Sequence, residues 1–433
     1  MNSRNRLMQN RNLDIPFFIY FTMMALFFTK TYIQLATQLG ILAYVAYDAF
    51  VRRRDIHKSI AIKNVKFLIV WFGVFVIWAF VSANWAYGIR EDTNTLLTLF
   101  RILVIAIALF SYSSSYEKTV GIIKAFVYST AIMALTVMIT TPLSQYGKAG
   151  EDGFGDVIGQ QRNAFGAFMT FVIPLCIMLY YYEGFKHGKK LAAFFAFALL
   201  CSGSRGAMLQ LVIILGLYVI TLPGLVKKIK YIFGAVIVAI IAVIALQNIP
   251  YLYETVWVRF INMFATVTGI EETADSSALT RELYKVLAWD MFAEKPIIGF
   301  GVDGFFCYLR DIEYINGYYV PPRYSHCNFT EIAANFGLVG LAIWYIPILK
   351  ILIDSFRLRR KIPNMKLVFI TLISMVILDY ARIPWASHHS MYTYFCIVLI
   401  YLCCKHSLSR RKYRSEYGLL EDDINEHLYS DSI

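Results

Sequence analysis

The chain has 433 residues, of which 58% are hydrophobic and 16% are charged. An average soluble domain has roughly 45–50% apolar and about 25% charged residues, so this composition excludes an ordinary soluble domain and predicts a membrane protein. The formal net charge of +12 does not by itself indicate a nucleic-acid partner, because the placement of basic residues decides their role. The seven cysteines lack paired CxxC spacing, so neither a disulfide framework nor a zinc site is predicted.

A membrane-spanning helix needs about 20 mainly apolar residues, and about twelve segments fit. We therefore predict an all-α polytopic membrane protein. The first, seventh and twelfth segments are short, which makes them candidates for a broken or re-entrant helix. No small-residue cleavage site follows the first segment, so it is expected to stay in the mature protein. The segments are 15–29, 33–50, 67–84, 96–112, 119–140, 163–182, 191–203, 205–222, 231–248, 328–350, 367–381 and 391–404.

Lysine and arginine are concentrated in alternate loops, such as the one over residues 51–66. The positive-inside rule assigns these loops and both termini to the cytoplasm. The basic charge therefore follows from topology, with the lipid bilayer as partner and no nucleic acid. The predicted parts are transmembrane helices 1–9 in 1–248, a large extracytoplasmic loop in 249–325, transmembrane helices 10–12 in 326–404 and a cytoplasmic tail in 405–433.

The long outer loop is predicted to contain helices of its own, because long structureless connections are uncommon in compact domains. An amphipathic helix of about 15 residues is expected after Ser276 and Ser277 and before Lys295-Pro296. Arg281 and Lys285 lie on the opposite face from its apolar residues. The apolar residues at helical spacing are Leu279, Leu283, Val286, Leu287 and Met291. The loop is also rich in tyrosine, which suits either the lipid interface or the faces of sugars.

Arg205 stands in a short polar break between two apolar runs, Cys201-Ser202-Gly203-Ser204-Arg205-Gly206. Such a turn places Arg205 in the first turn of a helix, with Ser204 as the N-cap. The helix dipole and the guanidinium both favour an anion there. The alternative is an arginine that reaches lipid head groups at a hairpin.

His326 precedes the apolar run that begins at Phe329, at the outer mouth of a predicted span. Polar residues surround it, so it is a candidate general base or hydrogen-bond partner. The alternative is an interfacial histidine without a chemical role. His388 and His389, beside Arg382, are competing candidates.

Two other patterns are interpreted without function. Gly299, Gly301 and Gly304 spell GxGxxG, but no βαβ unit surrounds them, so we predict a turn instead of a dinucleotide site. The acidic tail from Glu421 has no apolar period and is predicted to be solvated.

Together these motifs resemble the O-antigen ligase and polymerase superfamily. The similarity covers roughly residues 160–345 and departs from the family at Cys327, where the family often runs His directly into Asn. The motifs are Ser204-Arg205-Gly206, Arg281, Lys295-Pro296-Ile297-Ile298-Gly299-Phe300-Gly301 and Ser325-His326-Cys327-Asn328.

This resemblance implies a C-type membrane glycosyltransferase in the bacterial cytoplasmic membrane, with its active site on the outer face. The implied donor is an oligosaccharide on undecaprenyl pyrophosphate. Arg205 and Arg281 would hold the pyrophosphate without a metal or other cofactor, and His326 would activate the sugar hydroxyl. Arg162 is a possible third cation. Further candidate substrate-binding residues are Asn163, Asn328 and Arg323.

Three functions stay open at this stage. A polymerase would transfer the glycan to another lipid-linked repeat unit, and a chain-length regulator would then be a candidate partner. A ligase would transfer it to lipid A core. A polysaccharide transporter or flippase would instead need ionisable groups near the bilayer midplane. We favour the polymerase.

Overall fold

The computed structural model describes residues 13–27, 29–51, 58–90, 94–146, 153–159, 161–222, 224–247, 276–312, 314–315 and 318–417. Within these residues the structure is almost entirely helical, and a helix occurs at each of the twelve predicted segments. These helices are α2 (Ile15–Leu26), α3 (Thr31–Val51), α4 (Lys58–Leu68) continued by α5 (Val74–Ser82), α6 (Thr95–Tyr112), α7 (Tyr116–Thr140), α8 (Arg162–Glu183), α9 (Gly188–Ser202), α10 (Arg205–Ile220), α11 (Leu225–Gln247), α16 (Asn328–Leu358), α17 (Pro363–Leu378) and α18 (His388–Tyr417).

The segment after α11 holds α14 (Ser276–Glu294), α15 (Gly304–Ile312) and a small antiparallel hairpin of β1 (Tyr314–Ile315) and β2 (Tyr318–Tyr319). The prediction of an all-α fold is therefore confirmed except for this hairpin. The predicted acidic tail from Glu421 lies outside the described residues.

Length and hydropathy confirm a multi-pass membrane protein. Five stretches in the described part of the chain are long and apolar enough to cross a membrane: Ile60–Trp85, Thr95–Tyr112, Tyr116–Thr140, Arg162–Glu183 and Asn328–Leu358. Shorter apolar helices are Ile15–Leu26, Arg205–Ile220, Pro363–Leu378 and Ser390–His406. The count of twelve spans stays a prediction, because length and composition support only some of them.

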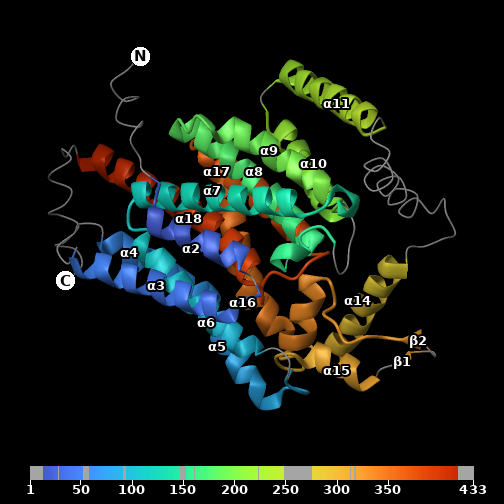
Figure 1. The fold of residues 1–433 in the computed structure, drawn as a ribbon. Helices are drawn as coiled ribbons and strands as arrows, with labels where there is room; N and C mark the ends of the chain where they lie inside the picture. The colour runs from blue at the N-terminus through green and yellow to red at the C-terminus, as the bar shows by residue number, and fades with distance from the viewer. Residues whose placement is uncertain are drawn as a thin grey trace.

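The helices form one bundle whose two ends differ (Figure 1). The beginning of α2, the end of α3, the beginning of α4 and the C-terminal end of α18 lie at one end, at the left of the view. The elements α14, α15 and the hairpin lie at the other end. Large aromatic side chains fill the centre between α5, α16 and α18, where the Phe75 and Trp344 ring centroids are 4.9 Å apart.

A second apolar cluster joins α14 and α15 to the bundle. Tyr284, Ala288 and Met291 of α14 pack with Phe300, Phe305 and Leu309 around α15 and with Ala334 of α16. Because this cluster is buried, it fixes α14 against the beginning of α16. The helix predicted after Ser276 and Ser277 is confirmed, with 19 residues and its end at Glu294, just before Lys295-Pro296; its placement outside the membrane stays a prediction.

The buried face of α14 differs from the predicted one. Lys285 was expected on the polar face, but only 7% of its surface is exposed, whereas Val286 is 55% exposed. The ammonium of Lys285 lies 3.8 Å from the centroid of the Tyr380 ring and donates to Glu282 Oε1 at 2.6 Å. The contacts with the Tyr380 ring and the Glu282 carboxylate offset the cost of removing this charge from water. The spacing of residues in the sequence does not reveal these contacts.

The helix that breaks is α16 instead of a short predicted span. Gly337 has φ 65° and ψ −162°, so residues 328–336 and 338–358 form two helical pieces. The 295–301 segment lies against the break and bonds to both pieces. Phe300 N and Gly301 N donate to Ala334 O and Asn335 O at 2.9 and 2.7 Å.

The second piece of α16 is satisfied by the same segment. Leu338 N donates to Pro296 O at 2.8 Å, and Val339 N donates to Ile297 O at 3.2 Å. Backbone groups freed at a break inside a membrane protein must find partners within the protein. The predicted glycine turn is confirmed, since Gly299 and Gly301 have φ values of +66° and +83°, and its role is to close this break.

Candidate active site

His326 lies in a tight turn directly before α16. Its φ of 60° is left-handed, which costs a residue with a side chain about 1–2 kcal/mol. The neighbouring Ser325 is fully buried, and its hydroxyl donates to Cys327 O at 2.9 Å. The Thr330 hydroxyl donates to Ser325 Oγ at 2.9 Å. The surrounding hydrogen bonds therefore hold a conformation that the histidine itself disfavours.

Two tyrosine rings enclose the imidazole of His326. Tyr284 of α14 is stacked on it with an interplanar angle of 13° and centroids 6.1 Å apart. Tyr324 lies two residues before it in the chain, with ring centroids 4.4 Å apart. The Tyr284 hydroxyl donates to Pro321 O at 2.8 Å, so this ring is fixed at both ends. The imidazole is half-buried as a result.

Positive charges surround this histidine. Burial, followed by the charges of Arg281, Arg323 and Lys285, lowers the pKa of His326 to about 4 from its ordinary value of 6.5. The ring is therefore neutral at physiological pH and has a nitrogen that can accept a proton. We refer to His326, Tyr284, Tyr324, Arg281, Arg323 and Lys285 as the His326 cluster.

A second polar group forms where α8 and α10 begin side by side. Arg162 is the first residue of α8, and Arg205 is the first residue of α10. Ser204 occupies the predicted N-cap position, but its side chain makes no capping hydrogen bond. Its hydroxyl instead donates to Asn163 Oδ1 at 3.2 Å. We call Arg162, Asn163, Ser204 and Arg205 the α8–α10 corner.

The close approach of α8 and α10 depends on Gly166. A Cβ at this position would lie 2.7 Å from Ser204 Cβ and 2.9 Å from Ala207 Cβ. Thr170 adds a bond between the helices, because its hydroxyl donates to Ala207 O at 3.0 Å. Two helix N-termini, each beginning with an arginine, therefore share one corner, and their dipoles and guanidinium groups suit an anion.

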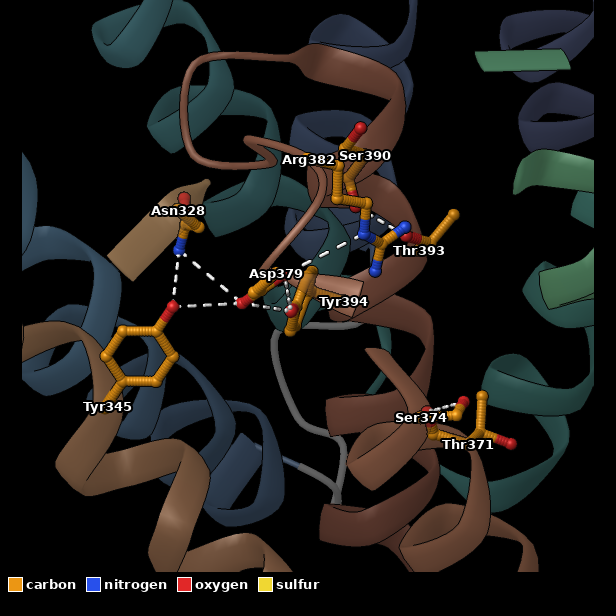
Figure 2. A network of polar contacts seen from close by, with 9 residues as sticks. All are labelled: Asn328, Tyr345, Thr371, Ser374, Asp379, Arg382, Ser390, Thr393 and Tyr394. Atoms are coloured by element: carbon orange, nitrogen blue, oxygen red, sulfur yellow. Dashed lines mark hydrogen bonds and ion pairs between the residues drawn. The ribbon is translucent and has the colours of Figure 1, made fainter. Parts of the chain in front are cut away.

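Asn328, a predicted substrate-binding residue, begins α16 and is fully buried. Its backbone N donates to Asp379 O at 2.6 Å, and its Nδ2 donates to Tyr345 OH at 2.8 Å (Figure 2). The Tyr394 hydroxyl donates to both carboxylate oxygens of Asp379 at 3.0 Å. The amide nitrogen of Asn328 thus serves to anchor α16, and a role in substrate binding remains a prediction.

The competing histidines have other surroundings. His388 begins α18, and its ring centroid lies 6.3 Å from that of Tyr392. The side chain of His389 lies outside the described residues. Arg382 lies beside Asp379, with Nε 3.8 Å from Oδ1, and its guanidinium points toward this carboxylate in Figure 2.

The structure thus brings the predicted residues into two groups. His326, Arg281 and Arg323 meet in the His326 cluster, whereas Arg162, Asn163 and Arg205 meet in the α8–α10 corner. Sequence reasoning missed Asp379, although an acidic residue at the end of an apolar span was a usable signal. Among the residues described, no group of three His, Cys, Asp or Glu side chains is placed to hold a metal ion.

These features define a multi-pass helical membrane protein with a neutral histidine among cations at one end of the bundle. Residues 191–345 match the family model described as O-antigen ligase, so this region of the chain is similar to that family. The match runs from α9 into α16 and includes Arg205, Arg281, Arg323, His326 and Asn328. It excludes Arg162 and Asn163.

The resemblance found from sequence motifs is confirmed by this match. Members of the family transfer lipid-linked glycans in polysaccharide biosynthesis. A search of curated proteins found no match.

Proposed function

We propose that the protein is a polysaccharide polymerase that transfers a glycan from undecaprenyl pyrophosphate to a sugar hydroxyl of another lipid-linked repeat unit. The observation that carries this proposal is the His326 cluster, which combines a neutral imidazole with three cationic side chains. A base and an anion-stabilising group are the two components that such a transfer needs.

In this reaction the acceptor hydroxyl oxygen forms a bond to the anomeric carbon of the donor. The bond between that carbon and the pyrophosphate oxygen breaks, and undecaprenyl pyrophosphate leaves with the bonding electrons. His326 takes the proton of the hydroxyl and later releases it to water. Because the imidazole is neutral, one of its ring nitrogens can accept this proton. The stacked Tyr284 ring lies beside the imidazole.

The leaving pyrophosphate needs positive charge where its negative charge develops. Arg281 acts on His326 electrostatically, so in our proposal it spans the base and the leaving group. Arg205 and Arg162 add two guanidinium groups at helix N-termini, where the dipoles also favour an anion. Arg323, Asn163 and Asn328 are proposed to contact the sugars or phosphates. The arginines take the electrophilic role without a metal.

The acceptor distinguishes a polymerase from a ligase. Both enzymes would use the same donor site, and none of the contacts above identifies lipid A core or a repeat unit. Purified protein supplied with donor alone should form longer lipid-linked chains if it is a polymerase, with a chain-length regulator as a candidate partner. Product formed only when lipid A core is added would instead establish the ligase.

We further propose that the α3–α4 end of the bundle is cytoplasmic and that the His326 end faces outward in a bacterial cytoplasmic membrane. In Figure 1 the end with α3 and α4 lies opposite the end with α14 and α15, and basic residues favour the cytoplasmic side. Cysteines introduced into 51–66 should resist an impermeant thiol reagent in intact cells, while cysteines at exposed Glu294 or Arg323 should react. Labelling of 51–66 in intact cells would reverse the proposed orientation.

The proposed base is tested with His326→Gln. This variant keeps a hydrogen-bonding amide but no group of suitable basicity, so transfer from purified donor is expected to fall by about 10²–10⁴-fold, while donor binding is retained. Transfer by the wild type should persist in chelator, because the arginines supply the positive charge. Near-normal turnover by His326→Gln would remove this residue from the mechanism, and loss in chelator would restore a metal.

The pH profile gives an independent check of the same base. Protonation of His326 removes the base, so the acidic limb of wild-type activity is expected near the lowered pKa of about 4 instead of 6.5. Arg323→Gln removes a positive neighbour, which raises the pKa of His326 and moves the acidic limb to higher pH. An unmoved limb would separate His326 from the pH dependence.

A further inference from the structure

Glu331 is a buried carboxylate in the first turn of α16, next to the turn that contains His326. Only 5% of its surface is exposed. Its Oε2 accepts a hydrogen bond from Ser325 N at 2.6 Å, and its Oε1 accepts one from Asn335 Nδ2 at 3.2 Å. Each carboxylate oxygen therefore has a separate donor, and one of these donors is the residue just before His326.

Asn335 extends this network to α15. It is 1% exposed, and its Oδ1 accepts from Phe305 N at 2.8 Å. Phe305 lies in α15 and belongs to the second apolar cluster, as does Tyr284, which stacks on His326. A continuous chain of hydrogen bonds thus runs from α15 through Asn335 and Glu331 to the backbone of the His326 turn.

The turn needs such support because His326 has left-handed backbone geometry. A strained conformation persists only where its surroundings hold it in place. The Glu331 bond fixes the N–H of Ser325, while the Ser325 hydroxyl bonds to Cys327 O on the other side of His326 at 2.9 Å. The backbone on both sides of His326 is thereby held by hydrogen bonds, one of which comes from Glu331 in α16.

We propose that Glu331, together with Asn335, is a positioning residue that holds the His326 turn in the geometry required for proton transfer. This inference rests on the proposed role of His326 as the base. Glu331 does not contact the substrates in this proposal. It acts through the backbone of Ser325, so its loss should reduce turnover and leave donor binding intact.

The donor and acceptor pattern supplies a specific test. Glu331→Gln leaves one acceptor oxygen where the carboxylate has two. If this oxygen accepts from Ser325 N, the new NH₂ group faces the NH₂ group of Asn335. Two donors then face each other and the hydrogen bond to Asn335 is lost. In the double variant Glu331→Gln/Asn335→Asp, the new amide can donate to the new carboxylate. That carboxylate can still accept from Phe305 N. The double variant therefore restores every bond and the original charge.

We expect Glu331→Gln to lower kcat on the order of 10²-fold, as a displaced reacting group does, with an unchanged KM for the lipid-linked donor. The double variant should recover most of this loss. Glu183→Gln is the matched control, because Glu183 is also buried and accepts a hydrogen bond from the Tyr116 hydroxyl. Glu183 lies at the C-terminal end of α8, whereas Arg162 lies at the N-terminal end of this helix. The control variant should leave kcat near the wild-type value, and all variants should be checked for monodispersity and thermal unfolding in detergent.

The outcomes separate the two proposals. Normal kcat for Glu331→Gln, an increased donor KM as its main effect, or no recovery in the double variant would each overturn the positioning role. If His326→Gln is itself fully active, the proposed function of His326 fails independently of any result at Glu331.

Discussion

Arg205→Ala is expected to reduce glycan transfer on the order of 10³-fold while the protein still accumulates in membranes. Arg205 begins α10 beside the start of α8, where two helix dipoles and a guanidinium group converge. Removal of one preorganised donor from a site of developing negative charge typically costs about 10²–10³-fold in rate. Transfer from purified lipid-linked donor, normalised to the amount of folded protein, measures the effect.

Arg205→Lys and Arg281→Lys refine the same experiment. Lysine keeps the charge but cannot make the bidentate contacts of a guanidinium group with a phosphate, so both variants should stay poor. Arg310→Ala is the matched control, because Arg310 is an arginine in α15 that pairs with Asp311 at 3.3 Å. Full activity in Arg205→Lys would contradict the proposed role of Arg205 in binding the pyrophosphate.

Gly337→Ala is expected to destabilise the protein severely. A backbone with φ 65° and ψ −162° is essentially restricted to glycine and costs other residues about 1–3 kcal/mol. In addition, an alanine Cβ would lie 2.3 Å from Ile297 O and 2.4 Å from Ile297 C, so the 295–301 segment must move. The two helical pieces of α16 would then lose hydrogen-bond partners for their backbone groups, including the partner of the Asn335 carbonyl.

Thermal unfolding in detergent and yield of monodisperse protein measure this effect. Gly40→Ala in α3 is a matched control, because no atom lies within 4 Å of the Cβ that it would add. Alanine is also the better helix former by about 1 kcal/mol, so this control should be neutral or slightly stabilising. A Gly337→Ala protein that is as stable as the control would contradict the structure at the α16 break.

The sequence was sufficient to locate the helices and the beginning of α16. Apolar runs of membrane length are a local property, because each side chain has its own free energy of transfer into lipid. The positions of Arg205 at the start of α10 and of α14 before Lys295-Pro296 also followed from local signals, namely a capping residue and helical spacing. These features do not depend on which helix lies beside which.

Only the tertiary structure decided which residues work together. The break at Gly337 exists because the 295–301 segment supplies hydrogen-bond partners to α16. Lys285 is buried because Tyr380, almost a hundred residues later, provides a ring for its ammonium. Glu331 and Asn328 find Ser325 and Asp379 through the packing of the turn and of α17. Hydropathy and spacing describe one segment at a time, whereas the burial and charge of a side chain depend on neighbours that only folding brings close.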